Sequence, residues 1–395
     1  MFNRRLVKLK RLLSRRKFLR FKMSFTGLIH EKANYHQPDF LIIGVIFSII
    51  FFGIIMLSSA SSAISFIKYG SAYAIFYNQI FGLVIGIIAF LVLSRFDYHR
   101  FHKVALWLLG GSLILLVLVF IPSLSAGWGH AKSWINVFGY SVQPSEFVKL
   151  TFLLYLAAWV EKRGRDLFDW HQGTKPFIIL LGIISFLMLM QPDTGTLLIL
   201  LAISLTVYFI GGGNIKHIAI MGLVGLVMLF VLIKIAPYQM DRFRCYFNPD
   251  YSADDECYQI SQSLIAAGSG GFLGRGFGDS RQKFRYLPEV QGDAIFPIIA
   301  EEMGFVVSSL LILLYAFLFY RGFLVSQHAP DTYGSLVAVG IVTWFCFQAF
   351  INIAGMINFM PMTGVPLPFI SFGGSAMLAS LMAAGILVNI SKQTR

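Results

Sequence analysis

Two carboxylates, Glu289 and Asp293, stand just before a long apolar run in the stretch YLPEVQGDAIFPIIAEEMGF, residues 286–305. Charge at the edge of a membrane segment is unfavourable, so such residues are candidates for function. A carboxylate held there can take a proton from a substrate hydroxyl. Asp is also a good helix cap, and a helix dipole lowers its pKa, whereas burial and a neighbouring Glu raise it. The residues alone leave both interpretations open.

A second polar group opens the apolar run that begins QPSEFVKL, residues 143–150. A proline in the first turn suits a helix start. Glu146 and Lys149 are three residues apart and therefore lie on one helix face. They form either a buried structural ion pair or part of a polar cavity that contacts an anionic substrate. Gln143 and Ser145 stand beside them and are further candidates for substrate binding.

Two turns between apolar runs also carry polar groups. In QPDTGT, Asp193 has the chemistry of a turn and a helix cap. In GVPLPFISFGGSAML, two prolines, the second of which is Pro368, prevent a continuous helix. Ser371, Gly373 and Gly374 offer hydroxyl and backbone donors. Non-helical backbone at membrane depth is tolerated only beside a cavity or buried in protein. This second turn is therefore predicted to be the roof of a pocket.

The polar stretch from about 236 to 293 is long enough to be functional rather than idle. Its six glycines between residues 268 and 278 fit neither a dinucleotide fingerprint nor a P-loop, and they predict turns and close backbone packing. Arg281, Lys283 and Arg285 alternate in what is expected to be an extended segment. They are either a solvated face or a surface that attracts a phosphate-bearing substrate.

The same stretch holds two of the three cysteines, Cys245 and Cys257. In an oxidising compartment the two could form a disulfide, and the alternative is a pair of free thiols. Cys346 lies within an apolar run, where packing is its expected role. The cysteines and histidines show no zinc-type spacing.

The elements that must position these residues are membrane helices. Of 395 residues, 57% are hydrophobic and only 13% charged, whereas a soluble domain carries about a quarter charged residues. The apolar residues form continuous blocks of about 18–25 residues, which span a bilayer as helices and exclude an outer-membrane barrel. The chain is predicted to be an all-α polytopic membrane protein with about ten transmembrane helices. The spans are expected near 39–60, 73–94, 104–121, 142–160, 176–191, 194–211, 215–235, 294–320, 333–356 and 365–390.

The net charge of +13 is explained by membrane topology rather than by nucleic-acid binding. Eleven Lys or Arg residues precede Asp39, and further basic residues fall in loops on the same side. The positive-inside rule then places residues 1–38 and 392–395 in the cytoplasm. The long loop at about 236–293, between spans seven and eight, becomes extracytoplasmic. The basic tail is expected to contact anionic lipid.

Four stretches together resemble one family, the SEDS (shape, elongation, division and sporulation) peptidoglycan glycosyltransferases typified by FtsW and RodA. They are QPSEFVKL, QPDTGT, YQISQSLIAAGSGGFLGRGFGDSRQKFRYLPEVQGDAIFPIIAEEMG and GVPLPFISFGGSAML. The segment GFGDSRQKFRYLPE is closer to FtsW, the division member, than to RodA. The resemblance covers about residue 39 to the C-terminus and implies a ten-helix membrane domain over 39–391. It departs from the family at Gly292, where Thr is common, and in Met362-Thr363-Gly364, which lacks a Lys found in some members.

The resemblance implies an enzyme of the plasma membrane, at the division septum, that polymerises lipid II and releases undecaprenyl diphosphate. Asp293 matches the family's essential acid, and Glu146 and Lys149 match its polar pair. The substrate-binding set expected for this chain is Gln143, Ser145, Glu146, Lys149, Asp193, Gln262, Arg281, Lys283, Glu289, Pro368, Ser371, Gly373 and Gly374. Implied partners are a class B penicillin-binding protein, the transpeptidase, and other divisome proteins.

The mechanism expected is a single inverting displacement with Asp293 as general base, by analogy with inverting hydrolases. The leaving diphosphate needs countercharge, from Lys149, from the basic residues at 281–285, or from a divalent cation such as Mg²⁺ or Mn²⁺ for which no ligand set can be read. Three alternatives remain: a lipid II flippase, a RodA-like elongation polymerase, and a scaffold without activity.

Overall fold

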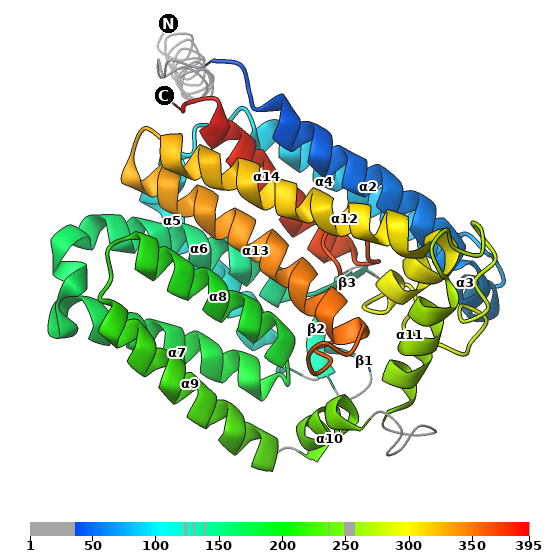
Figure 1. Cartoon of the computed structure of the whole chain (residues 1–395). Helices are drawn as coiled ribbons and strands as arrows, with labels where there is room; N and C mark the ends of the chain where they lie inside the picture. Colours follow the sequence, from blue (N-terminus) through cyan, green and yellow to red (C-terminus); the bar gives the residue numbers. More distant parts are fainter. Residues whose placement is uncertain are drawn as a thin grey trace, which may run out of the picture.

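The computed structural model describes residues 36–121, 125–128, 131–137, 140–235, 237–248 and 257–394, so most of the expected basic tail lies outside the described part. The chain folds mainly into helices (Figure 1). They are α2 (Phe40–Ala60), α3 (Ser62–Tyr69), α4 (Ala74–Leu93), α5 (His99–Leu118), α6 (Pro144–Arg163), α7 (Lys175–Met190), α8 (Thr194–Ile210), α9 (Ile215–Ile235), α10 (Pro237–Phe247), α11 (Tyr258–Ser269), α12 (Ile295–His328), α13 (Thr332–Met356) and α14 (Gly374–Ser391). Short 3-10 and π turns, η1 (Gly164–Phe168) and η2 (Trp170–Thr174), join α6 to α7.

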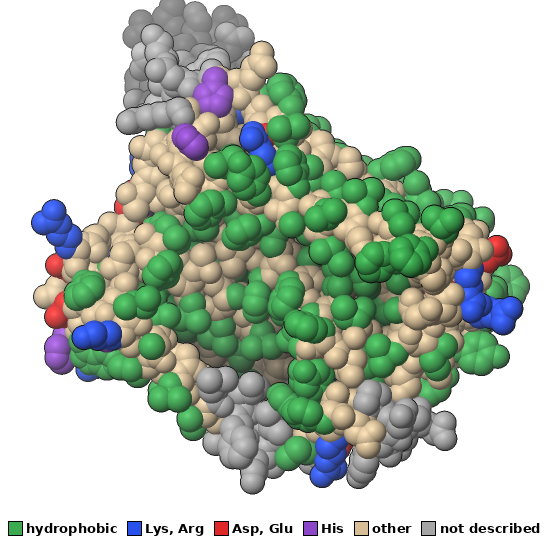
Figure 2. Space-filling model, viewed as in Figure 1, with side chains coloured by type: hydrophobic (Ala, Val, Ile, Leu, Met, Phe, Trp, Pro, Cys, Tyr) green, Lys and Arg blue, Asp and Glu red, His purple; other side chains and the backbone are tan. Residues whose placement is uncertain are grey.

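Within the described residues, seven helices are long and apolar enough to cross a membrane. They are α2, α4, α5, α7 with the preceding η2, α12, α13 and α14. Of the other helices expected to span, α8 has only 17 residues and α6 carries charged residues at both ends. Figure 2 shows hydrophobic side chains spread over the middle of one face and charged side chains at its edges, as expected for a surface that contacts lipid.

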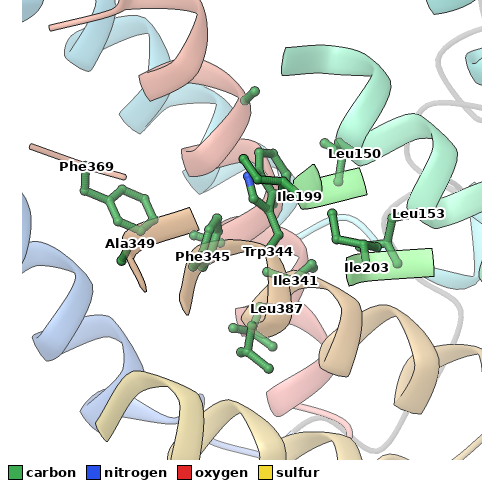
Figure 3. Close-up of a cluster of buried hydrophobic side chains, with 14 of the residues drawn as sticks. Leu150, Leu153, Ile199, Ile203, Ile341, Trp344, Phe345, Ala349, Phe369 and Leu387 are labelled. Atoms are coloured by element: carbon green, nitrogen blue, oxygen red, sulfur yellow. The ribbon is translucent and has the colours of Figure 1, made fainter. Parts of the chain in front are cut away.

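Helix α13 is at the centre of the bundle. Of the 18 residues in its most apolar stretch, 78% are buried inside the protein, whereas the corresponding share for α5 is 22%. Trp344 and Phe345 of α13 pack with side chains of α6, α8 and α14, among them Leu150, Ile199 and Leu387 (Figure 3). The bundle is thus organised around one helix, and the C-terminal part of that helix contacts the segment that carries the candidate base.

The connection between α5 and α6 contains a small antiparallel sheet, β1 (Ser125–Trp128), β2 (Ala131–Val137) and β3 (Tyr140–Val142), in the order β1-β2-β3. The prediction of an all-helical chain missed this sheet. Its strands are short and alternate little, so they lack the period-two pattern that marks a strand in a sequence.

Helix α12 is broken at Gly304, where φ is 74°. The loop after α11 satisfies the backbone groups that the break leaves free. Arg275 N donates to Glu301 O and Gly276 N to Glu302 O, each at 3.0 Å, while Phe305 N donates to Gly271 O at 2.9 Å. The glycine-rich stretch was predicted to allow turns and close backbone packing, and this is confirmed. The eighth span, expected near 294–320, is divided: a short half-helix, residues 295–303, precedes the longer one.

Replacing Gly304 by Ala should destabilise the protein strongly. A Cβ there would lie 2.2 Å from Gly274 N, and the backbone has a positive φ that favours glycine. The strain alone costs on the order of 1–3 kcal/mol, and we expect a lower midpoint of thermal unfolding in detergent. Gly110→Ala in α5 is the matched control, because nothing lies within 4 Å of its Cβ position and an added methyl in a helix should be neutral or mildly stabilising. Equal midpoints for the two variants would contradict this interpretation.

Candidate active site

Asp293 lies directly before the half-helix of α12, but it does not cap that helix. The cap position is Ala294, and no side chain caps the helix there. Instead, the Asp293 Oδ1 atom accepts a hydrogen bond from Gln259 Nε2 of α11 at 3.3 Å. Its backbone carbonyl accepts one from Asn352 Nδ2 of α13 at 2.8 Å. The interpretation of Asp293 as a helix cap is therefore wrong: α11 binds its carboxylate and α13 binds its backbone.

The surroundings of Asp293 raise its basicity. Its pKa is raised to about 6, because burial disfavours the charged form and the Glu289 carboxylate repels it, while Arg242 of α10 acts in the opposite direction. A Cβ placed on Gly364 would lie 3.6 Å from Arg242 Nη2 and 3.7 Å from Asp293 Oδ2, so guanidinium and carboxylate face the same turn of backbone. A carboxylate with this pKa is ionised at neutral pH and is a stronger base than an ordinary Asp.

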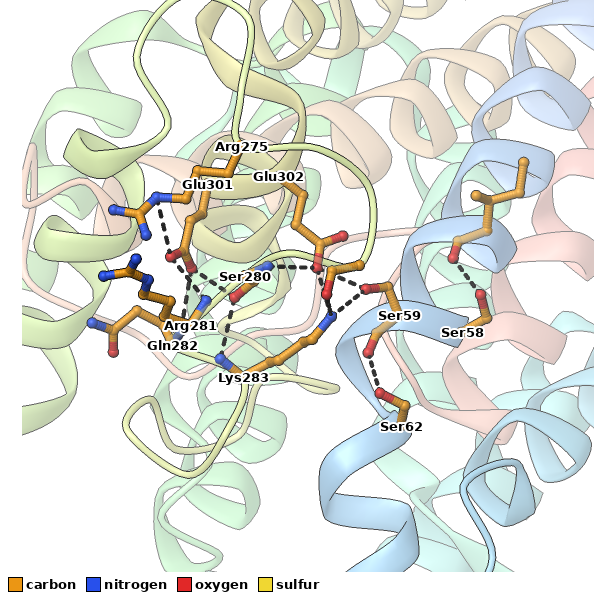
Figure 4. A network of polar contacts seen from close by, with 12 residues as sticks. Ser58, Ser59, Ser62, Arg275, Ser280, Arg281, Gln282, Lys283, Glu301 and Glu302 are labelled. Atoms are coloured by element: carbon orange, nitrogen blue, oxygen red, sulfur yellow. Dashed lines mark hydrogen bonds and ion pairs between the residues drawn. The ribbon is translucent and has the colours of Figure 1, made fainter.

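The half-helix that follows Asp293 is anchored at its far end by two buried acids, Glu301 and Glu302 (Figure 4). Glu301 Oε2 accepts a hydrogen bond from Ser280 Oγ at 2.6 Å, and Glu301 Oε1 accepts one from Arg281 N at 3.1 Å. The turns around residue 280 thus supply donors for a carboxylate that would otherwise be costly to bury. The sequence signal for this anchor was available, since two adjacent acids inside an apolar run need partners.

Lys283 belongs to this anchor. Its ammonium lies 3.0 Å from Glu302 Oε1 and donates to Ser59 Oγ of α2 at 3.0 Å (Figure 4). The predicted extended basic segment is wrong because the residues around Lys283 form turns. Lys283 is buried and its charge is paired, so the structure does not support it as a phosphate-binding residue. Arg281 and Arg285 remain exposed.

Glu146 and Lys149 of α6 form a buried ion pair of 2.8 Å. Lys149 Nζ also donates to Gln348 Oε1 of α13 at 2.9 Å, and Gln348 Nε2 donates to the Pro366 carbonyl at 2.8 Å. The Lys149 ammonium lies 4.7 Å from the centre of the Trp344 ring. The expectation of a buried structural pair is thus confirmed. The pair connects α6 through α13 to the turn that lies against Asp293.

Asp193 caps α8, as its sequence context predicted. Its Oδ2 atom also accepts hydrogen bonds from Ser145 Oγ at 2.9 Å and Gln143 Nε2 at 3.3 Å, so three of the predicted site residues meet at the start of α6 and α8. Gly195 of α8 packs closely against Thr363, because a Cβ on Gly195 would lie 2.9 Å from Thr363 O. The group around Asp193 therefore lies against the turn next to Gly364.

The segment between α13 and α14 is non-helical, as its prolines predicted, and its residues 365–371 are mostly buried. The Pro368 carbonyl accepts a hydrogen bond from a buried tyrosine of α12, and the Ser371 hydroxyl accepts one from a backbone amide of the same turn. Gly373 N donates to Gln79 Oε1 of α4 at 3.0 Å, and α14 begins at Gly374. These predicted residues therefore shape the turn that approaches Asp293.

The remaining predicted residues lie around the same end of the bundle. Gln262 is partly exposed on α11, one helical turn from Gln259. Glu289 is exposed, and its Oε2 atom accepts a hydrogen bond from Gln291 Nε2 at 3.1 Å. Three residues that approach Asp293 from other helices were not predicted, namely Arg242, Gln259 and Asn352. No local pattern marks them, because their importance depends on long-range packing.

Comparison with known proteins gives a consistent result. The sequence model of the FtsW/RodA/SpoVE family, described as cell cycle protein, matches residues 39–395. Stage V sporulation protein E of Bacillus subtilis is 38% identical over 91% of this chain and 98% of its own length. A protein of Geobacter sp. (strain M18) named probable peptidoglycan glycosyltransferase FtsW is 35% identical over 87% of this chain and 94% of its own length.

Solved structures resemble the whole membrane domain. One chain of a peptidoglycan synthase complex, described for the coordination of polymerization and crosslinking, aligns with a TM-score of 0.73 and 26% identity, covering 90% of this chain and 97% of that chain. The rod shape determining protein RodA of Thermus thermophilus aligns with a TM-score of 0.66 and 26% identity, over 90% and 97% of the two chains.

Proposed function

Since this chain belongs to the FtsW/RodA/SpoVE family, we propose that it is a peptidoglycan glycosyltransferase in which Asp293 is the general base. One observation carries the assignment of the base. Asp293 is held by Gln259 and Asn352 outside any helix cap, in surroundings that raise its pKa to about 6. The substrate is lipid II, a disaccharide-peptide carried on undecaprenyl diphosphate. The direct test is the formation of glycan strands from lipid II by the purified protein.

The proposed reaction is one displacement. Asp293 takes the proton of the 4-hydroxyl group of the acceptor GlcNAc, and that oxygen attacks the anomeric carbon of the donor MurNAc. The bond from this carbon to the diphosphate oxygen breaks, and undecaprenyl diphosphate leaves with the bonding electrons. An α-linked donor thereby gives a β-1,4 product, so one base on the acceptor side is sufficient.

The leaving diphosphate needs positive charge nearby. Lys149 and Lys283 were predicted for this task, but both are buried in ion pairs. Arg242, beside Asp293 and Gly364, and the exposed Arg281 are better placed to meet a phosphate from solvent or lipid. We therefore assign the countercharge to these two arginines.

A divalent cation is retained as part of the proposal. The described residues contain no group of three or more His, Cys, Asp or Glu side chains that could hold a metal ion. Mg²⁺ is commonly held by one or two carboxylates together with substrate phosphates, so the diphosphate of bound lipid II would supply part of the ligand set. Such an ion would neutralise charge on the diphosphate. Loss of polymerisation on chelation, restored by Mg²⁺ or Mn²⁺, would support it.

The rate of polymerisation should depend on the ionisation of Asp293. Its pKa is raised to about 6, so the carboxyl is neutral below this pH and is an active base above it. We expect kcat to fall about tenfold for each pH unit well below 6 and to level off above about 7, since the ionised fraction follows the pKa. A profile of kcat between pH 5 and 8 measures this. A flat profile over that range would contradict the assignment of the base.

We further propose ten spans with both termini in the cytoplasm, and the loop at about 236–293 outside the cytoplasmic membrane. The basic residues near the N-terminus and the hydrogen bond of 2.8 Å from His36 Nε2 to Thr394 O, which brings the two ends of the described chain together, support this orientation. A position at the division septum, with a class B penicillin-binding protein and other divisome proteins as partners, is supported by the relatives named FtsW and by the solved synthase complex. Accessibility of single cysteines to an impermeant maleimide would test the orientation.

A further inference from the structure

A disulfide links two helices that both reach the candidate base. Cys245 of α10 and Cys257, which directly precedes α11, are bonded, with their Cα atoms 5.2 Å apart. Both side chains are buried, and together with Ile260 they form a small hydrophobic cluster separate from the main core, with Leu264 packed against it. The two helices thus share a miniature core in which the disulfide is the central element. The expectation that the two cysteines could pair is confirmed.

Each of the two helices directs one polar side chain towards Asp293. Arg242 lies three residues before Cys245, on the same face of α10. Gln259 follows Cys257 by two residues, at the start of α11, and donates to Asp293 Oδ1 at 3.3 Å. Arg242 faces the Gly364 backbone beside Asp293 Oδ2. The disulfide therefore lies about one helical turn or less from both side chains that approach the carboxylate.

The two helices are attached to the bundle differently. Helix α11 packs on α12, and its end is so close that a Cβ on Gly270 would lie 2.0 Å from Ala300 O. Helix α10 has a hydrogen bond of 3.2 Å from Asn358 Nδ2 to its Tyr246 carbonyl, and the disulfide joins it covalently to α11. The position of Arg242 is thus set through a helix that the disulfide fixes to a firmly packed neighbour.

We infer that the Cys245–Cys257 disulfide is a positioning element of the active site, which holds Arg242 and Gln259 against Asp293. This inference rests on the proposed function, because it assigns a task to the two cysteines in the reaction for which Asp293 is the base. Cys245 and Cys257 touch no reacting atom, so they are positioning residues and not catalytic ones.

The consequence follows from the groups that face Asp293. Arg242 from α10 favours its ionised form, Gln259 from α11 donates to it, Asn352 from α13 holds its backbone, and Glu289 from its own segment repels it. Without the disulfide, Arg242 and Gln259 are held less firmly, whereas burial and Glu289 remain. The carboxyl should then hold its proton to higher pH, and the acid limb of the rate profile should move in the same direction.

The test uses the full-length Cys245→Ser/Cys257→Ser variant in detergent, with lipid II as substrate. We expect the midpoint of the acid limb of kcat to rise by about one pH unit, which lowers the rate at pH 6 by about fivefold and changes it little at pH 8. Cys346→Ser is the control, because Cys346 is the free cysteine of the described chain and lies elsewhere, on α13. Its profile should match the wild type. Arg242→Gln should give a shift of the same sign, and combining it with the double serine variant should add little.

If the serine variant does not fold, the folded wild-type protein is reduced with an excess of phosphine and assayed before and after reoxidation. A reversible shift of the acid limb supports the inference. A folded, disulfide-free protein with the wild-type profile overturns it. Failure of the proposed function and failure of this inference give different results. Full activity of Asp293→Asn would reject the proposed base. An inactive Asp293→Asn beside an unchanged Cys245→Ser/Cys257→Ser variant would reject only the role of the disulfide.

Discussion

Asp293→Asn should lower the rate of glycan polymerisation by about 10²–10⁴-fold, the range that a positioned general base contributes. The amide has nearly the shape of the carboxylate and keeps an oxygen that can accept from Gln259, so the backbone contact to Asn352 and the turn at Gly364 should be preserved. What it loses is the ability to take a proton. The measurement is the initial rate of strand formation from fluorescent lipid II by the purified variant.

The control for this substitution is Asp279→Asn, which removes an exposed carboxylate from the loop that precedes Asp293. It makes the same change in net charge and in side-chain chemistry, so it reports any general effect of charge on lipid II recruitment. We expect it to remain close to wild-type activity. Similar losses in both variants would mean that charge in the loop, and not a proton transfer at Asp293, determines the rate.

Lys149→Met should destabilise the protein by about 3–5 kcal/mol, the cost of leaving one partner of a buried ion pair without the other. Glu146 is almost fully buried, and its Oε1 atom would lose the ammonium at 2.8 Å. Gln348 would also lose one of the donors to its Oε1 atom, and its amide holds the Pro366 carbonyl beside the site. The midpoint of thermal unfolding in detergent measures the effect, and polymerisation should fall with the folded fraction.

The matched variant is Glu146→Gln/Lys149→Met, in which no buried charge is left alone. It should recover most of the lost stability, since replacing both partners of a buried pair is often nearly neutral. It should also recover measurable polymerisation, because the structure gives the pair a structural task. A stable double variant without activity would instead assign Glu146 and Lys149 to substrate binding, and a single variant as stable as the wild type would contradict the burial argument.

Features with a local cause could be predicted from the sequence. The start of α6 at Pro144 follows from the tolerance of proline in a first turn, and the start of α8 follows from the Asp193 cap. The prolines before Ser371 gave the interruption between α13 and α14 for the same reason. A carboxylate beside an apolar run also marked Asp293 as a candidate, but the residues alone left it open between a base and a helix cap, and only the family resemblance favoured the base.

Features that depend on contacts between distant segments could not be predicted. The break at Gly304 requires a loop about thirty residues earlier in the chain to satisfy its backbone groups, and one glycine in an apolar run does not reveal this. Lys283 has the sequence context of a surface cation, but its partners lie on the distant helices α2 and α12. Arg242 was not predicted, although it comes to lie beside Asp293.

The most direct test of the central claim is to incubate the purified chain with lipid II in detergent, alone and with a class B penicillin-binding protein, in the absence of any membrane gradient. The wild type should give glycan strands that a β-1,4-specific muramidase degrades, and Asp293→Asn in the same preparation should give essentially none. A wild-type protein that moves lipid II across vesicle bilayers but forms no strands in either condition would contradict the account and indicate a carrier instead.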